Sequence, residues 1–236
     1  MSNKEKFTIL ALEIFLGVIL SIYCASYFGR DIYFLFYHLT YGVILSVTIP
    51  LVHCKFREKG DLKDFGIKVP KAKEWFIAIS FIIFSIGGQL INIKLEKVPF
   101  NLLALSMAPL IMTTFFEEFL FRGFIQTRVE KLYGNIIAII ISGGAFSLYH
   151  LGYPPFRNFK MLLVLFLVGM MFAIAYRMSG NNLVISYFVN LTNAILTYLL
   201  APNNFPTFDL KVTIVSTVTI MATLIILVTF NRSFKK

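Results

Sequence analysis

The chain has 236 residues, of which 58% are hydrophobic and only 14% are charged. Soluble domains carry about 25% charged residues, so this composition excludes an ordinary water-soluble globular domain and predicts a polytopic membrane protein. The formal net charge of +10 could favour nucleic acid in a soluble protein. In a membrane protein it indicates basic loops between apolar spans, so the expected partner is the lipid bilayer and no nucleic acid.

Apolar runs of bilayer-spanning length predict an all-α fold with about eight transmembrane helices in a single domain over residues 1–236. The first run follows the polar segment MSNKEK, but it lacks an A-x-A cleavage site and is expected to be a mature helix rather than a signal peptide. The expected spans are 7–27, 32–52, 75–95, 100–127, 134–152, 161–178, 183–200 and 210–230.

Basic residues are divided unevenly between the two sets of span ends. With alternating spans, 15 Lys and Arg fall on one side and six on the other. The positive-inside rule then places both termini in the cytoplasm. Loop 54–74 holds seven of the 15 and is expected to be a solvated or headgroup-facing linker. The Phe-, Ile- and Lys-rich composition favours the cytoplasmic membrane of a bacterium as the location of this multi-pass protein.

The segment 112–126, MTTFFEEFLFRGFIQ, places three charged residues inside a predicted span. Each charge costs about 2.5–3.5 kcal/mol at the bilayer centre, so the three need a partner or a purpose. Glu118 and Arg122 have the i,i+4 spacing of a helical ion pair, and Glu117 points about 100° away. Glu117 could then act as a general base, and a structural ion network is the alternative. Glu13, in the first span, is expected near a helix interface.

The next predicted span supplies a histidine at the depth of Glu117. The turn near Tyr133 and Gly134 lies about 16 residues after Glu117 and about 16 before His150. In an antiparallel helix pair at a separation of about 8–10 Å, a water could bridge the carboxylate and the imidazole. His150 is expected to be the only histidine deep in the core. A packed histidine without a chemical role is the alternative, but its level placement favours a functional one.

Two amides in the seventh span could also take part. The preceding turn lies at 179–182, so Gly169 and Asn190 again fall at one depth. Asn190 and Asn193 are related by i,i+3 and could donate hydrogen bonds to a developing oxyanion. Hydrogen bonding between helices is the alternative for both amides.

These segments resemble the motifs of a known family. EEFLFR (117–122) is similar to the EExxxR motif, and FSLYH (146–150) to the FxxxH motif, of the CPBP family of CAAX proteases and bacteriocin-processing (Abi) intramembrane proteases. FLVG (166–169) and SGNNLVISYFVNLTN (179–193) resemble the third and fourth blocks. The resemblance covers residues 109–194, which would form the motif-bearing, catalytic-type core.

The resemblance implies an eight-helix bundle with an active site inside the membrane that opens to the cytoplasmic side. By similarity, Glu117 and His150 would activate water for peptide-bond hydrolysis. Glu118 and Arg122 would orient the catalytic group, and residues of the fourth block would hold the oxyanion. The implied substrate is a hydrophobic or lipidated peptide or protein.

The fourth block departs from the family pattern HxxxN. Asn190 stands where the histidine is expected, Asn193 comes one position early, and Ala194 occupies the usual asparagine position. An asparagine side chain still offers an NH2 group to an oxyanion. The departure leaves a second function open, a non-catalytic binding or immunity protein of the same fold.

The expected chemistry needs no cofactor. A zinc site takes at least three protein ligands. A divalent metal held by Glu117, Glu118 and His150 is the alternative to metal-independent hydrolysis. A proton-coupled transporter is less favoured, because the sequence shows no inverted repeat or paired half-helices.

Overall fold

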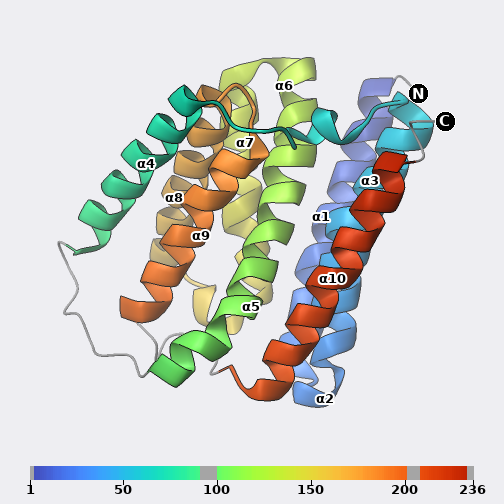
Figure 1. Ribbon diagram of the computed structural model, residues 1–236. Coiled ribbons are helices and arrows are strands. Elements are labelled where there is room, and N and C mark those ends of the chain that lie inside the picture. Colours follow the sequence, from blue (N-terminus) through green and yellow to red (C-terminus); the bar gives the residue numbers. More distant parts are fainter. Residues whose placement is uncertain (1–2, 91–99, 201–207, 233–236) are drawn as a thin grey trace.

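The computed structural model describes residues 3–90, 100–200 and 208–232. Within these ranges the chain is helical and contains no strand, which confirms the predicted all-α fold (Figure 1). Eight helical segments are long and apolar enough to cross a membrane. The protein is therefore a multi-pass membrane protein, as its composition predicts.

The helices include α-helical, π-helical (η1, η2, η4) and 3₁₀ (η3, η5, η6) elements. They are α1 (Asn3–Tyr27), α2 (Arg30–Tyr33), η1 (Phe34–Thr48), α3 (Ile49–His53), η2 (Cys54–Glu58), η3 (Leu62–Phe65), α4 (Ala72–Leu90), α5 (Phe100–Glu118), η4 (Phe119–Gln126), α6 (Thr127–Tyr133), α7 (Asn135–Tyr149), η5 (His150–Gly152), η6 (Pro154–Phe156), α8 (Phe159–Met178), α9 (Leu183–Leu200) and α10 (Leu210–Arg232).

Most predicted spans agree with the structure within a few residues, and α9 agrees at both ends. The fourth span is longer than predicted, because α5, η4 and α6 form one continuous helical segment, Phe100–Tyr133. At about 1.5 Å per residue this segment exceeds the thickness of a hydrocarbon core of about 30 Å, so one end projects beyond it. The third span was predicted to reach residue 95, but residues 91–95 lie outside the described ranges.

The two predicted hairpin turns are both present. Gly134 ends α6 with a φ of 86°, and Gly180 and Asn181 separate α8 from α9 with φ values of 69° and 60°. Positive φ is accessible to glycine without steric cost and is tolerated by asparagine. These residues therefore reverse the chain and return α7 and α9 alongside the helices before them.

The continuous segment from α5 to α6 occupies the middle of the bundle, with α9 on one side and α10 on the other (Figure 1). Behind it, α7 and α8 approach closely where two glycines meet. A side chain at Gly169 would place its Cβ only 3.0 Å from the carbonyl oxygen of Gly143. Small residues allow this close helix packing in membranes.

The first turn of α1 and the last turn of α10 lie at the same end of the bundle (Figure 1). An even number of spans produces this arrangement. The assignment of that end to the cytoplasm rests on the distribution of basic residues and stays a prediction.

Glu13 does not lie at a helix interface, so that prediction is wrong. The buried face of α1 is formed by Ile14, Val18 and Ile22, which follow each other at i,i+4. Glu13 lies about 100° from this stripe, and its side chain is exposed on the outside of the bundle.

Residues 54–74, which we call the strap, cross one end of the bundle between α3 and α4 (Figure 1). The strap was expected to be a solvated or headgroup-facing linker, and part of it also packs against the fourth span. Phe65 is fully buried and stacks on Phe119 with 4.6 Å between ring centroids. Arg128 binds Glu58 at 2.7 Å and covers the ring of Phe65. The buried ring of Phe65 and the half-buried ion pair of Arg128 with Glu58 therefore fix the strap to the bundle.

Candidate active site

The two adjacent glutamates are buried at the junction of α5 and η4. Glu117 is 6% exposed and Glu118 is fully buried. The helix changes from α-helical to π-helical hydrogen bonding directly after Glu118. Short π-helical insertions widen a helix locally and are frequent at functional sites.

Glu118 and Arg122 form the ion pair that their spacing predicts. The distance from Arg122 Nη1 to Glu118 Oε1 is 3.3 Å, and both side chains are completely buried. A buried carboxylate requires such a partner, because removal from water costs each ion several kcal/mol. The pair holds Glu118 along its own helix and leaves Glu117 to contact other helices.

Arg122 also joins three of the motif blocks. Its Nη2 donates a hydrogen bond of 2.8 Å to the carbonyl oxygen of Gly169 on α8. The guanidinium lies 4.7 Å from the ring centroid of Phe146 on α7 and 5.3 Å from that of Phe172 on α8. Arginine suits this position because its planar group can stack on rings while it donates hydrogen bonds.

Glu117 is held from two neighbouring helices. The hydroxyl of Tyr149, at the end of α7, donates a hydrogen bond to Glu117 Oε1. Asn190 Nδ2, on α9, donates to Glu117 Oε2 at 3.0 Å. Each carboxylate oxygen therefore has a donor of its own, which fixes the orientation of the carboxylate plane.

Asn190 connects the two glutamates. Its Nδ2 also donates to Glu118 Oε1, at 2.9 Å. An asparagine amide carries two N–H donors, and here one is directed at each carboxylate. Neither is directed into open space, as a donor to a substrate oxyanion would be. The predicted oxyanion role of Asn190 is therefore not the role seen in this arrangement, in which the amide bridges two buried carboxylates.

His150 lies beside Tyr149, with 4.1 Å between the ring centroids. Its Nδ1 lies 2.8 Å from the carbonyl oxygen of Phe146. A carbonyl oxygen can only accept a hydrogen bond, so Nδ1 carries the proton and the lone pair of the neutral ring is on Nε2. The residue of this hairpin that contacts Glu117 directly is Tyr149, the neighbour of His150 in the chain.

Asn193 lies outside this cluster, contrary to the prediction that both amides belong to the site. Its Oδ1 accepts hydrogen bonds from Ser85 at 2.7 Å and from Gln89 at 2.5 Å, both on α4. Three residues along a helix rotate a side chain by about 60°. This rotation turns Asn193 from α5 towards α4, where it makes the interhelical contact that was the alternative.

His150 is also not the only deeply buried histidine. His38, in η1, is 2% exposed, and its Nδ1 lies 3.3 Å from Thr219 Oγ1 on α10. Nearby aromatic rings include Tyr33 and Tyr37. A histidine in an apolar span therefore does not by itself indicate a functional site. What distinguishes His150 is the pair of buried carboxylates, Glu117 and Glu118, beside its neighbour Tyr149.

The described His, Cys, Asp and Glu residues include no group of three or more placed to hold a metal ion. Glu118 is also committed to Arg122. The donor geometry therefore does not favour the alternative in which Glu117, Glu118 and His150 together bind a divalent metal.

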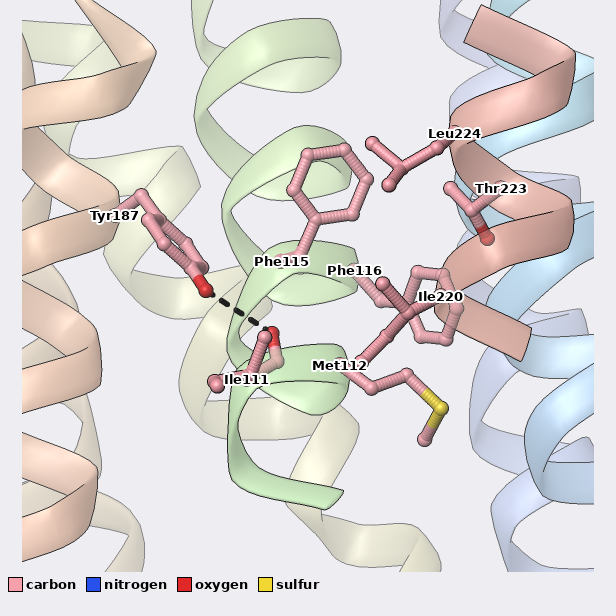
Figure 2. A pocket seen from close by; sticks show the side chains of 8 residues that line it. All are labelled: Ile111, Met112, Phe115, Phe116, Tyr187, Ile220, Thr223 and Leu224. Carbon is pink, nitrogen blue, oxygen red and sulfur yellow. Dashed lines mark hydrogen bonds between the residues drawn. The ribbon is translucent and has the colours of Figure 1, made fainter. Parts of the chain in front are cut away.

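A pocket of about 180 Å³ lies between α5, α9 and α10, and the residues that line it do not include any predicted site residue (Figure 2). Its walls are apolar. The Tyr187 hydroxyl points to the backbone of α5 and donates to the Ile111 carbonyl oxygen at 3.3 Å, and the Thr223 hydroxyl donates to Thr219 within α10. Since both hydroxyls are already bonded, the pocket offers no chemical group for catalysis.

Comparison with known families agrees with the motifs. Residues 99–201 match the family described as type II CAAX prenyl endopeptidase Rce1-like. This match supports the resemblance to CAAX-type proteases. The matched region contains all four motif blocks and the buried residues Glu117, Glu118, Arg122 and Asn190. The match to the Rce1-like family supports a role as a CAAX-type intramembrane protease. Among curated proteins, none gave a significant match.

Proposed function

We propose that the protein is an intramembrane endopeptidase that hydrolyses a peptide bond in a hydrophobic or lipidated peptide or protein. The observation that carries the proposal is the setting of Glu117. This carboxylate is buried among membrane-spanning helices and oriented by Tyr149 and Asn190, and the ring of Tyr149 packs on the imidazole of His150. The family match over residues 99–201 supports the same class of reaction.

In the proposed reaction, Glu117 is the general base and the nucleophile is water. The water oxygen forms the new bond to the peptide carbonyl carbon as its proton passes to the Glu117 carboxylate. The C–N bond then breaks, and the same proton is delivered to the leaving amine nitrogen. His150 Nε2 has a lone pair and can accept a hydrogen bond from the second O–H of the water. This hydrogen bond would orient the attacking oxygen.

Glu118 and Arg122 have a supporting part in this proposal. Their ion pair fixes the helix that carries Glu117 and ties it to α7 and α8. We assign Asn190 to the same supporting group, because its amide holds both carboxylates. It could donate to an oxyanion only after one of these hydrogen bonds is released. Asn193 has no part in the chemistry.

The double engagement of Asn190 also favours a second candidate, a non-catalytic binding or immunity protein with the same fold. In such a protein the carboxylate cluster would serve only to hold helices together. Binding of its ligand would then persist after Glu117→Ala, whereas hydrolysis by an enzyme would not.

The direct test uses purified protein and a panel of fluorogenic peptides that differ in apolar length and in the presence of a prenylated cysteine. We expect cleavage of at least one peptide class by the wild type. Glu117→Ala should lower the rate by at least about 10³-fold, and His150→Ala by about 10²-fold or more, as expected for groups in proton transfer. Unchanged rates in both variants would rule out the proposal.

A further inference from the structure

Tyr149 occupies a variable position of the FxxxH segment, so the motif assigns it no role. The structure gives it a specific contact. Its side chain is 1% exposed, and its hydroxyl donates to the Oε1 of Glu117. Tyr149 and Glu117 come from different spans, α7 and α5, and this hydrogen bond joins them at the centre of the proposed site.

The ring of Tyr149 is packed on several sides, so its hydroxyl has little freedom to move. The centroid distances are 5.1 Å to Phe121, 6.2 Å to Tyr41 and 5.7 Å to Phe146. The fourth neighbour is the imidazole of His150, at 4.1 Å. Tyr149 therefore contacts both groups that act on the water in the proposed reaction, the base Glu117 and the orienting His150.

We propose that Tyr149 is a positioning residue, which sets the orientation of the Glu117 carboxylate relative to His150. This inference rests on the proposed function. Asn190 cannot fix the carboxylate alone, because it holds only Oε2 and shares its amide with Glu118. The second hydrogen bond, from Tyr149 to Oε1, prevents rotation of the carboxylate about the bond that joins it to the side chain.

The test compares Tyr149→Phe with Tyr41→Phe. Tyr41 is a matched control because it is also fully buried and stacks on Tyr149, whereas the hydrogen bonds to the Glu117 carboxylate come from Tyr149 and Asn190. Each substitution removes one oxygen and keeps the ring. We expect Tyr149→Phe to lower kcat by about 10–100-fold with KM within about threefold, because orientation matters at the transition state. Tyr41→Phe should change kcat by less than about threefold.

An unchanged kcat in Tyr149→Phe, beside an inactive Glu117→Gln, would overturn the positioning role and leave the proposed function intact. An active Glu117→Gln would instead remove the proposed function. Equal losses in Tyr149→Phe and Tyr41→Phe would show a packing effect and also overturn the inference. Size-exclusion profiles and thermal unfolding of the purified variants establish that both are folded.

A second, independent observation concerns the charges of the strap. Its four acidic residues all have partners within the protein. Glu58 pairs with Arg128 at 2.7 Å, and Glu74 accepts from Asn182 at 2.8 Å. Asp61 and Asp64 form the capping box of η3. The negative charges are therefore compensated by the fold.

The basic residues of the strap face outward. Arg57, Lys59, Lys63, Lys71 and Lys73 are all exposed. Two apolar side chains between them are exposed as well, Phe56 at 70% and Val69 at 89%. The strap connects the candidate spans Phe34–Glu58 and Ala72–Leu90 and includes the last turn of the first and the first turn of the second. We therefore expect this mixed basic and apolar surface at the level of the lipid headgroups.

We infer that the outer surface of the strap binds the phosphate groups of anionic phospholipids in the adjacent leaflet. Charge complementarity carries this choice, because Lys and Arg side chains near an anionic bilayer surface are attracted to its phosphate groups. The exposed Phe56 and Val69 match the acyl boundary beneath the headgroups, as in interfacial segments that combine basic and apolar side chains.

The test is the binding preference for spin-labelled phosphatidylglycerol over phosphatidylcholine in proteoliposomes of mixed composition. Lys59→Gln with Lys63→Gln removes two strap charges. The matched control, Lys160→Gln with Lys211→Gln, removes two exposed charges from the starts of α8 and α10 at the other end of the bundle. We expect the strap variant to lower the preference by about threefold or more and the control to leave it within about 1.5-fold. An unchanged preference in the strap variant, or equal losses in both, would overturn the inference.

Discussion

We compare two polar clusters within the membrane-spanning helices. They differ in charge and in how many of their buried polar atoms are hydrogen-bonded. The first, which we call the carboxylate cluster, consists of Glu117, Glu118, Arg122 and Asn190. The second, the amide clasp, consists of Ser85, Gln89, Asn193 and Thr197, which join α4 to α9 through neutral hydrogen bonds of 2.5–3.3 Å. Asn190 and Asn193 are only three positions apart, yet each belongs to a different cluster.

The hydrogen bonding of the two clusters shows the difference most clearly. In the amide clasp, Gln89 and Thr197 bind each other and Asn193 accepts from two donors. In the carboxylate cluster, Glu118 Oε2 and Arg122 Nε are buried and have no hydrogen-bond partner among the described residues. Neutral contacts of the first kind are common between membrane helices. Incompletely satisfied buried charges are costly and call for an explanation beyond stability, and the proposed proton-transfer chemistry would supply one.

The largest expected effect on stability comes from Arg122. Arg122→Leu would leave Glu118 fully buried without its ionic partner, and breaking such a pair costs about 3–5 kcal/mol. Gln89→Leu, in the amide clasp, should cost about 1 kcal/mol or less. Free energies of unfolding in detergent, measured by denaturant titration, give both values. Similar losses of unfolding free energy in the two variants would show that the two clusters do not differ in their contribution to stability.

Arg122→Lys separates the effect of the charge from that of the planar guanidinium. The variant keeps the charge but lacks the planar group that lies near the rings of Phe146 and Phe172. We expect a loss of stability between those of Arg122→Leu and Gln89→Leu.

The next effect separates the two asparagines by activity. Asn190→Leu removes the only amide shared by both glutamates and should lower peptide cleavage by about 100-fold, because one oxygen of Glu117 loses its donor. Asn193→Leu is the matched control at the other cluster, and its cleavage rate should stay within about threefold of the wild type. The reverse order of sensitivity would place the chemistry near α4 instead.

The smallest effect is the coupling inside the amide clasp. Asn193→Ala and Gln89→Ala each remove one side of the 2.5 Å hydrogen bond. A double-mutant cycle should give a coupling energy of about 0.6 kcal/mol, the average for such contacts in membrane proteins. A coupling energy above about 2 kcal/mol would mean that the clasp is more than ordinary helix association.

Much of the fold follows from residue patterns that act locally. The apolar run of α9 and the glycines at the two hairpin turns predict their elements closely, because span length and positive φ are properties of short segments. The ion pair of Glu118 with Arg122 follows from helical spacing in the same way.

The predictions that differ from the structure concern side chains whose partners depend on which helix packs beside them. Asn190 and Asn193 have the same residue type and similar depth, and only the packing of α9 between α5 and α4 separates their partners. Tyr149 was overlooked because an aromatic residue in an apolar span is usually core. Its signal was the position directly before His150. Phe65, a single aromatic residue in a basic loop, was the corresponding signal for the packed strap.

In the proposed mechanism Glu117 is the base of a hydrolytic site, and its position in the carboxylate cluster gives it this role. The most direct measurement compares cleavage of one peptide substrate by Glu117→Gln and by Glu13→Gln. The two changes are chemically identical, but Glu13 lies on the exposed face of α1. Glu117→Gln should lower kcat by at least about 10³-fold, and Glu13→Gln should leave it within about twofold. Cleavage by Glu117→Gln at the wild-type rate would contradict the account.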